Sequence, residues 1–360
     1  MTASVLSYWR DWFDPGGRAW GENHSTGLIA ANLHRLLARR GPVSYLDHAE
    51  RPRGLEADLF VGHFWAFAPM VRANRFRRSA AVYVLSDPTT ARRELAEAAA
   101  AAGVPMPDWD LPPAEFDHEA TLALADAVLL CGNAATRASF PARWRRKVHL
   151  FNYSLDPARW SPPAGRPAPR PTEFVYAAST CGLRKGFLDL IATWRGIPPE
   201  RARCHVVGRL DPPYDKLLAE ADAPSVVVHG WVDSASPQYR DLLRSCAFAY
   251  VPTWVEGQMG TLLETIFAGC IPITTAACGV DDEVLRHCVL VEPRRPDQHR
   301  AAIAAVLRWT PAERRRRQEA LWAAARRRHD WAVFDAQVDS VLDEVLAAAA
   351  SGSRRVGDDG

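Results

Sequence analysis

Two glutamates, Glu256 and Glu264, stand eight residues apart between two apolar stretches of the sequence. The stretches 248–251 and 271–275 are predicted to be strands, and the residues between them a loop followed by an amphipathic helix. In open α/β sheets, ligands bind beyond the carboxyl ends of the strands, where the N–H groups of a helix start can face an anion. The loop 256–260 is therefore predicted to be a ligand site, in which the two carboxylates hold different parts of one extended polar ligand.

Glu264 also has a purely structural interpretation. Thr261 and Glu264 have the T-x-x-E spacing of a capping box, in which the threonine covers an unpaired N–H and the glutamate reaches back to the helix start. In that case the pair stabilises a helix and contacts no ligand.

The segment 256–274, EGQMGTLLETIFAGCIPIT, resembles the signature of the family-4 (group 1) glycosyltransferases of the GT-B fold, which is close to EGFGLxxLEAxAxGxPVI. The chain departs from this signature at residues 258–260, where the family usually has an aromatic residue, a glycine and a leucine. The resemblance implies that Glu264 binds the ribose hydroxyls of a nucleotide-sugar donor and that Glu256 steadies the sugar. The further donor-binding residues implied in this segment are Gly257, Gln258, Met259, Gly260 and Thr261.

Two cations precede Gly186 and resemble the R-K-G element of the same family, which contacts the nucleotide diphosphate. Arg184 and Lys185 suit this role because charge accumulates on the leaving diphosphate, and a fixed cation stabilises that charge most in the transition state. The resemblance also places Trp231 and Val232 beside the nucleotide base. Trp231 either stacks there or fills the core of its domain.

Two further candidates follow strands predicted at 57–62 and 80–85. His63 is a candidate catalytic residue that orients a sugar hydroxyl or moves a proton, since imidazole titrates near neutrality. The alternative is a histidine at the edge of an aromatic core. Asp87 is the second candidate, at the place where many family members have a histidine. The segment HFWAFAP after the first strand is expected to be a bounding loop.

The alternation of strands and helices predicts an α/β protein, and the resemblance implies the GT-B fold, with two doubly wound Rossmann-like domains facing a central cleft. Residues 1–160 are expected to form the acceptor-side domain and residues 161–331 the nucleotide-sugar domain. A last helix at about 332–349 is expected to pack back on the first domain, and the tail 350–360 to be disordered.

Net charge, cysteine content and apolar runs limit the classes of partner that the sequence leads us to expect. A formal net charge of +2 gives no general case for nucleic acid, and seven scattered cysteines indicate reduced thiols in a cytoplasm. No signal peptide or long apolar run is evident, so a cytoplasmic, soluble protein is expected. Two basic segments, 73–78 and 141–147, are either solvated surface or a peripheral contact to anionic lipid.

The sequence therefore predicts a retaining glycosyltransferase that moves a sugar from a nucleotide-sugar donor to an acceptor hydroxyl. No metal is expected, because the one D-x-D motif, at 108–110, stands among prolines rather than at the end of a strand. Two alternatives are a sugar-nucleotide-binding protein without transfer activity and a nucleotide-sugar epimerase of the same fold.

Overall fold

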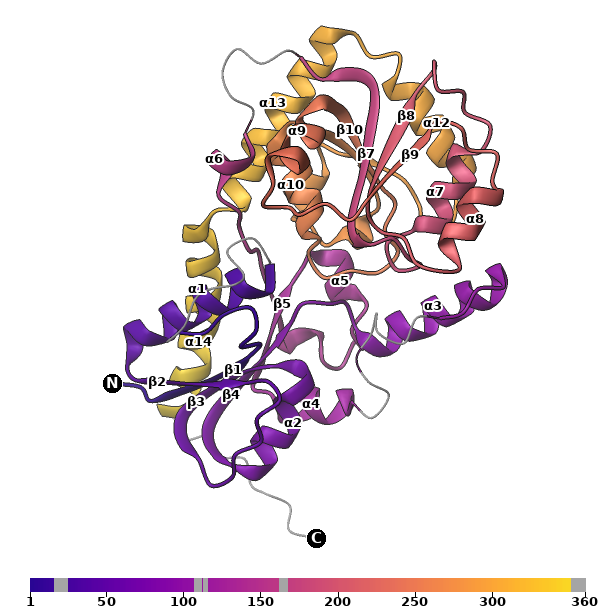
Figure 1. Cartoon of the computed structure of the whole chain (residues 1–360). Coiled ribbons are helices and arrows are strands. Elements are labelled where there is room, and N and C mark those ends of the chain that lie inside the picture. Colours follow the sequence, from indigo (N-terminus) through magenta and orange to yellow (C-terminus); the bar gives the residue numbers. More distant parts are fainter. Residues whose placement is uncertain (16–24, 107–111, 113–115, 162–167, 351–360) are drawn as a thin grey trace.

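The computed structural model describes residues 1–15, 25–106, 112, 116–161 and 168–350, and within them the chain forms two layered α/β halves (Figure 1). Each half has a six-stranded sheet, with strand orders β2-β1-β3-β4-β5-β6 and β12-β11-β10-β7-β8-β9. Neighbouring strands in both sheets pair in parallel. The predicted α/β class with two doubly wound sheets is confirmed.

The first half runs to the end of β6. Its elements, in chain order, are β1 Ser4–Tyr8, α1 Ser25–Arg40, β2 Val43–Asp47, β3 Glu56–His63, α2 Phe64–Ala73, β4 Arg75–Tyr83, α3 Pro88–Ala102, α4 His118–Leu124, β5 Ala127–Cys131, α5 Ala134–Ala138, η2 Arg145–Lys147 and β6 Val148–Phe151. The strand order reverses between β1 and β3, which makes the carboxyl ends of these two strands the place where such a sheet binds ligands.

The second half contains the segment that the sequence singled out. Its elements are β7 Arg170–Thr180, α7 Phe187–Trp194, β8 Arg203–Arg209, α8 Tyr214–Glu220, β9 Val226–Gly230, α9 Pro237–Ser245, β10 Cys246–Val251, α10 Gly260–Ala268, β11 Ile271–Thr274, η3 Ala276–Cys278, α11 Asp282–Leu285, β12 Val289–Leu290, α12 Pro296–Val306 and α13 Pro311–Arg328. Here the reversal lies between β7 and β10.

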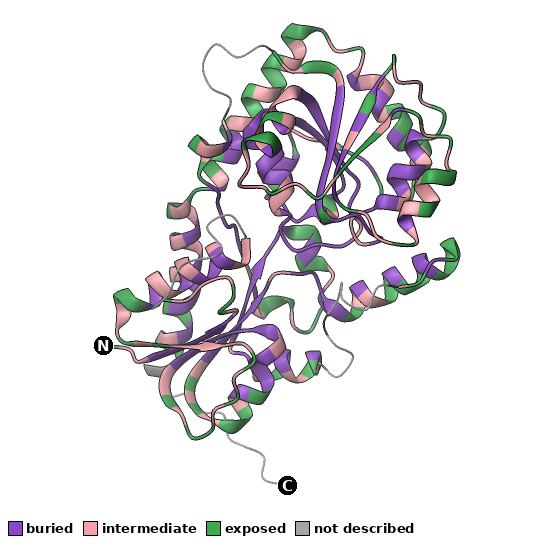
Figure 2. Ribbon diagram, viewed as in Figure 1, coloured by how far each residue is buried: buried purple, intermediate pink, exposed green. Residues whose placement is uncertain are grey.

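Buried apolar residues explain why these strands are central. Every residue of β5, β10 and β11 is buried, as expected for parallel strands covered by helices on both faces (Figure 2). Side chains cap some of the helix starts. At α5, the side chains of Asn133 and Thr136 each accept a hydrogen bond from the backbone N–H of the other.

Two elements of the first half differ from the sequence prediction. β2 was not predicted, because its residues VSYLD are only partly buried at the sheet edge and lack a continuous apolar run. The segment after β3 is not a bounding loop but the helix α2, which contains Pro69 and buries Phe64, Phe67 and Met70. The aromatic residues of this segment do not recur with the period of a helix. Its structure is set by packing against α4, β3 and β4.

The last helix, α14 Trp331–Ala350, leaves the second half and packs on β4, β5, β6 and α1 of the first (Figure 1). Arg35 of α1 binds Asp335 of α14 with both terminal nitrogens, and Arg40 binds Asp343 at 2.6 Å. The tail was expected at 350–360, but residue 350 ends α14, and residues 351–360 lie outside the described residues.

The chain crosses between the halves twice, and the two crossing segments are bonded to each other. The first crossing follows β6 and the second lies between α13 and α14. The Asn152 N–H donates to the Gln337 side chain at 2.9 Å, and Ser154 donates its hydroxyl to the His329 carbonyl. Between the crossings, α6 Pro157–Trp160 packs against α10, and Arg244 of α9 donates to the Trp160 carbonyl at 3.1 Å.

Candidate functional site

A cleft of about 750 Å³ lies where the carboxyl ends of the two sheets face each other. Its lining comes from both halves, including residues that follow β1, β3, β7 and β10. These are the two points at which the strand orders reverse, so the cleft occupies the position expected for ligands in doubly wound sheets.

Glu264 lies in this cleft and does not cap α10. The side chain is buried, and the Tyr239 hydroxyl from α9 donates to its carboxylate at 2.7 Å. Thr261 instead donates its hydroxyl to the Ala177 carbonyl of β7 at 2.8 Å, and Met259 occupies the N-cap without a side-chain bond. The capping-box interpretation is therefore wrong.

The burial of Glu264 has an electrostatic consequence. Removal from water raises the pKa of Glu264 from 4.5 to about 7, although the Tyr239 hydrogen bond and the Arg159 charge act in the opposite direction. The folded chain therefore contains a buried carboxyl group that lines the cleft and is unfavourable to ionise. A perturbed acid in a cleft is typical of a functional site rather than of a structural cap.

Glu256 holds both cations of the R-K-G element. Arg184 donates to a Glu256 carboxylate oxygen at 2.7 Å, and the Lys185 ammonium contacts the same oxygen. Burial by itself raises the pKa of Glu256, but the two cations outweigh it and the pKa falls below its ordinary value. All three side chains line the cleft, so the structure brings together the charges that the sequence singled out.

The loop that carries Glu256 is pressed against the first half. The Ser86 N–H donates to the Glu256 carbonyl at 3.1 Å. A Cβ on Gly257 would lie 2.3 Å from the Val84 carbonyl oxygen and 2.9 Å from that of Cys131. Only glycine therefore allows the two backbones to approach this closely.

The three positions that depart from the family signature have identifiable contacts. The Gln258 amide donates to the Tyr153 carbonyl at 3.1 Å, across the two halves, and the buried Met259 donates its N–H to the Cys278 carbonyl at 2.9 Å. A Cβ on Gly260 would lie 2.4 Å from the Tyr153 hydroxyl. Gln258, Met259 and Gly260 all line the cleft, together with Thr261.

The residues after β9 lie at the mouth of the cleft. Trp231 is 66% exposed, so it does not fill the core of its domain, and both Trp231 and Val232 line the cleft. An indole left this exposed at a cleft is available to stack on a flat ring.

His63 and Asp87 have different surroundings. His63 ends β3, lines the cleft and is 2% exposed, with its ring packed edge-on against Tyr8 at 5.3 Å between centroids. Burial lowers the pKa of His63 to about 3, which leaves the ring neutral near pH 7. His63 thus has the environment of an aromatic core edge and also faces the cleft.

Asp87 is held by structural partners. It caps α3 through the Thr90 N–H at 2.7 Å and bonds the His118 ring at 2.5 Å. Asp87 is not among the described residues that line the cleft, and both carboxylate oxygens are engaged.

Sequence reasoning missed several residues that line the cleft. They are Tyr239, Tyr153, Trp9, Trp12 and Trp65. Tyr239 is 25 residues from Glu264 in the chain, and no local spacing links the two. Trp9 follows β1 directly, so its position at a strand end was a usable signal.

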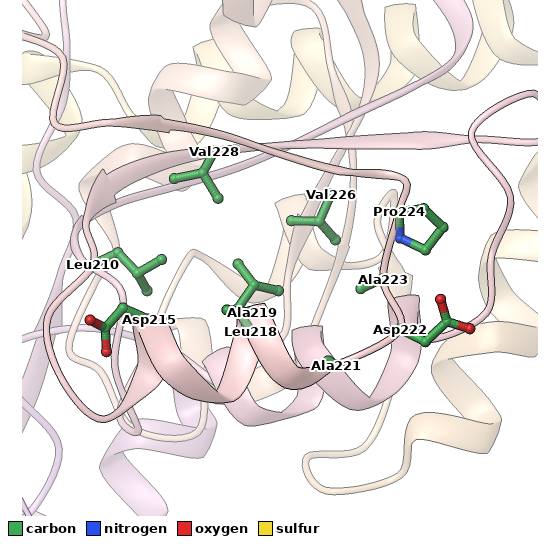
Figure 3. Close-up of a pocket in the computed structure, with 10 residues that line it drawn as sticks. All are labelled: Leu210, Asp215, Leu218, Ala219, Ala221, Asp222, Ala223, Pro224, Val226 and Val228. Carbon is green, nitrogen blue, oxygen red and sulfur yellow. The ribbon is translucent and has the colours of Figure 1, made fainter.

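A second hollow, of about 450 Å³, lies between α8 and the edge strand β9 (Figure 3). Its lining is mostly apolar and includes Leu210, Leu218 and Val226, with the carboxylates of Asp215 and Asp222. It shares no described residue with the cleft and holds none of the predicted site residues.

Among the described residues, no group of three histidine, cysteine, aspartate or glutamate side chains is placed to hold a metal ion, and the motif 108–110 lies outside them. In the part of the chain that is described, no helix is long and apolar enough to span a bilayer. In the basic segment 73–78, Arg75, Arg77 and Arg78 form ion pairs with carboxylates at 3.0 to 3.3 Å.

Comparison with known proteins agrees with the geometry of the second half. Residues 171–308 match the family model described as glycosyl transferases group 1. No curated protein matches the chain in sequence.

Solved structures resemble the whole fold. Sucrose-phosphate synthase from Thermosynechococcus elongatus superposes with a TM-score of 0.68 at 16% identity, covering 97% of this chain and 100% of that one. HepE from Anabaena, in complex with UDP and glucose, has a TM-score of 0.63 at 12% identity, with coverage of 96% and 100%. An α,α-trehalose-phosphate synthase from Burkholderia vietnamiensis has a TM-score of 0.56 at 15% identity, with coverage of 89% and 79%.

The matched segment 171–308 contains Glu256, Glu264, Arg184 and Lys185, and the fold around it extends over both halves. Residues 171–308 therefore match the group 1 glycosyl transferase family, and the chain as a whole has the GT-B fold of these solved structures.

Proposed function

We propose that this enzyme transfers a sugar from a nucleotide-diphosphate sugar to an acceptor hydroxyl, with retention of anomeric configuration and without a metal ion. The observation that carries the proposal is the joint position of Glu264 and the pair Arg184 and Lys185 in one cleft, at the carboxyl ends of β7 and β10. A nucleotide sugar carries ribose hydroxyls and a diphosphate, and these groups match a carboxylate and two cations.

Each part of the donor then has a partner. Glu264 accepts hydrogen bonds from the ribose hydroxyls, and Arg184 and Lys185 bind the diphosphate. The base lies beside Trp231 and Val232 at the mouth of the cleft. The sugar lies against the loop 256–260 and the start of α10.

The chemistry needs no protein nucleophile. The bond between the anomeric carbon and the diphosphate oxygen breaks while the acceptor oxygen bonds to the same face of that carbon, and the diphosphate takes the acceptor proton. Arg184 and Lys185 stabilise the negative charge that develops on the leaving group. Glu256, held ionised by these cations, stabilises the positive charge on the sugar.

A thermal-shift screen tests the donor half of the proposal. UDP, GDP, ADP and their common sugar conjugates are compared on the wild type, on Glu264→Gln and on the matched control Glu220→Gln at the exposed end of α8. UDP is the first choice because the similar HepE structure holds UDP. A ligand that binds only the folded state raises its midpoint, so one nucleotide should stabilise the wild type and the control but not Glu264→Gln. An equal response of all three proteins would contradict the proposal.

Turnover separates the transferase from its alternatives. Incubation of the bound donor with and without acceptors distinguishes transfer, epimerisation of the donor and binding alone. NMR of the product then reports the anomeric configuration, and an inverted product would contradict retention. Activity that persists in excess EDTA supports the absence of a metal, whereas loss that Mg²⁺ restores would contradict it.

A further inference from the structure

The first half contributes an aromatic wall to the cleft. Trp9, Trp12 and Trp65 line it and are only partly buried. Trp9 follows β1 and Trp65 follows β3 by two residues, so both lie at the point where the first sheet reverses its order. This is the ligand-binding position of a doubly wound sheet, here on the side opposite to the donor residues.

The side chains of this wall hold one another in place. Trp9 stacks on His48 with a centroid distance of 3.7 Å and meets the Trp65 ring at 5.2 Å in a T-shaped contact. His63 lies edge-on to Trp65 at 5.5 Å. Aromatic contacts of this kind fix ring orientation, so the wall is formed before any ligand arrives.

Charge in the cleft is distributed unevenly. The described lysines, arginines, aspartates and glutamates of the lining all belong to the second half: Arg184, Lys185, Arg209, Asp233, Glu256 and Glu264. The described lining from the first half contains none of these four residue types, and burial keeps His63 neutral because its pKa lies at about 3. Arg10, which follows Trp9, is paired with Glu50 at 2.9 Å and does not line the cleft.

The wall also holds polar atoms that have no partner. The indole nitrogen of Trp65 and Nδ1 of His63 are buried and make no hydrogen bond. An unpaired buried polar atom is unfavourable, and a small shift that lets a ligand hydroxyl bond it removes this cost. An entirely apolar ligand would leave both atoms unpaired.

We propose that the acceptor is an uncharged saccharide that lies against Trp9 and Trp65, and that phosphorylated or otherwise anionic acceptors are rejected. A sugar ring has an apolar face that packs on indole and hydroxyls that reach the polar nitrogens. A phosphate on this wall would lose its water without gaining a cation from the described residues. The inference rests on the proposed function, because it assigns the acceptor side of the same cleft.

Calorimetric titration tests the assignment without requiring turnover. The wild type is first saturated with the nucleoside diphosphate that the donor screen identifies. It is then titrated with a panel of neutral mono- and disaccharides, each paired with its 6-phosphate, and with phenol as an uncharged aromatic alcohol. We expect at least one neutral saccharide to bind, and at least about tenfold more tightly than its phosphate.

Matched variants show whether the wall is the binding surface. Trp9→Leu should weaken saccharide binding by roughly tenfold or more, and Trp9→Phe should restore part of it, because a smaller ring still offers a stacking face. Trp144→Leu is the control, since Trp144 belongs to the same half, pairs with Glu119 at 3.0 Å and does not line the cleft. Nucleotide binding, measured on every variant, confirms that each one is folded.

The outcomes separate this inference from the proposed function. A wild type that binds nucleotide but no neutral saccharide, or that prefers the phosphate or the phenol, overturns the inference and leaves the donor assignment intact. The same holds if Trp9→Leu and Trp144→Leu bind the saccharide equally. A wild type that binds no nucleotide contradicts the proposed function itself.

Discussion

Tyr239 donates its hydroxyl to a carboxylate oxygen of Glu264 at 2.7 Å, and both side chains are buried in the donor half of the cleft. The pair joins α9 to α10 and holds in place a carboxyl whose pKa is raised by burial. The role proposed for Glu264 therefore has consequences for stability as well as for binding.

Glu264→Gln should change how stability depends on pH. The pKa of Glu264 is about 7 in the folded chain and 4.5 in the reference state, so its contribution to stability is fully present below about 4.5 and is lost as the pH rises through about 7. The glutamine variant cannot ionise, so at pH 8 it should exceed the wild type by roughly 3 kcal/mol in unfolding free energy. Urea unfolding between about pH 5 and pH 8 measures the difference, and parallel curves for the two proteins would exclude an elevated pKa.

Nucleotide affinity should rise as the pH increases through about 7, where Glu264 becomes ionised. A carboxylate accepts ribose hydroxyls better than a carboxylic acid does, since hydrogen bonds to ionised groups are stronger. Titration of the nucleoside diphosphate at several pH values measures this effect. Glu264→Gln serves as the control, because in this variant the ionisation of residue 264 no longer contributes to the pH dependence of binding and that of the ligand remains. An identical pH profile in the variant and the wild type would argue against a contact between Glu264 and the ribose.

Glu256→Gln and Lys185→Met should have opposite effects on nucleotide binding. The glutamine releases Arg184 and Lys185 for the diphosphate, so binding is kept or strengthened while transfer falls on the order of 10²–10³-fold. Lys185→Met removes a charged hydrogen bond and should weaken nucleoside diphosphate binding by about tenfold to a hundredfold. Calorimetry and turnover measured on the same preparations distinguish the two effects. Equal losses of binding in both variants would show that Glu256 contacts the nucleotide directly or holds the site together.

Gly257→Ala should disturb the contact between the two halves. The new Cβ would meet the Val84 carbonyl at 2.3 Å, and backbone cannot move aside as a side-chain end can. We expect a loss of about 1–3 kcal/mol in stability together with reduced transfer. Gly196→Ala measures backbone strain without a close contact, because its φ is +70° but no atom lies within 4 Å of its Cβ, whereas Gly257 has no positive φ. A melting curve of Gly257→Ala that matches that of the wild type would contradict the close approach.

His63→Gln should make the protein less sensitive to acid. The pKa of His63 is about 3 when folded and 6.5 in the reference state, so the unfolded chain binds the proton more readily and stability falls as the pH drops below about 6.5. Removing the imidazole should shrink the stability difference between pH 7 and pH 4.5 by about 2 kcal/mol. Denaturant unfolding at these two pH values measures the change, and an unaltered difference would show that His63 titrates normally.

The sequence was sufficient for the unit from β10 to β11 because its signals are local. A buried strand, a loop, a helix that ends at Gly269 and a second buried strand follow one another without interruption. Arg184 and Lys185 line the same cleft as Glu256 and Glu264 because strand ends of one parallel sheet share an edge.

What the sequence did not reveal depends on contacts between distant residues. Nothing near Thr261 indicates that its hydroxyl bonds Ala177, 84 residues away, so the capping box remained a valid local alternative. The edge strand β2 and the helix α2 lack a clear apolar period, and only packing against the rest of the first half selects their structures. Asp87 follows a predicted strand, which is a plausible position for a site residue. Its hydrogen bond with His118 cannot be inferred from the spacing of the two residues in the sequence.

The bonds between the two crossing segments determine how the halves can move. Asn152 of the first crossing is bonded to Gln337 in α14, and Ser154 is bonded to His329 of the second crossing, so both connections pass through one small region. Once the contacts of the loop 256–260 with Ser86 and Val84 separate, two bodies whose chain connections share one region rotate about it, and displacement grows with distance from that pivot. Gln258 bonds Tyr153, next to the pivot, and should travel little, whereas Trp231 at the mouth should swing through the longest arc. Opening would then release the base end of a nucleotide first and the sugar end last.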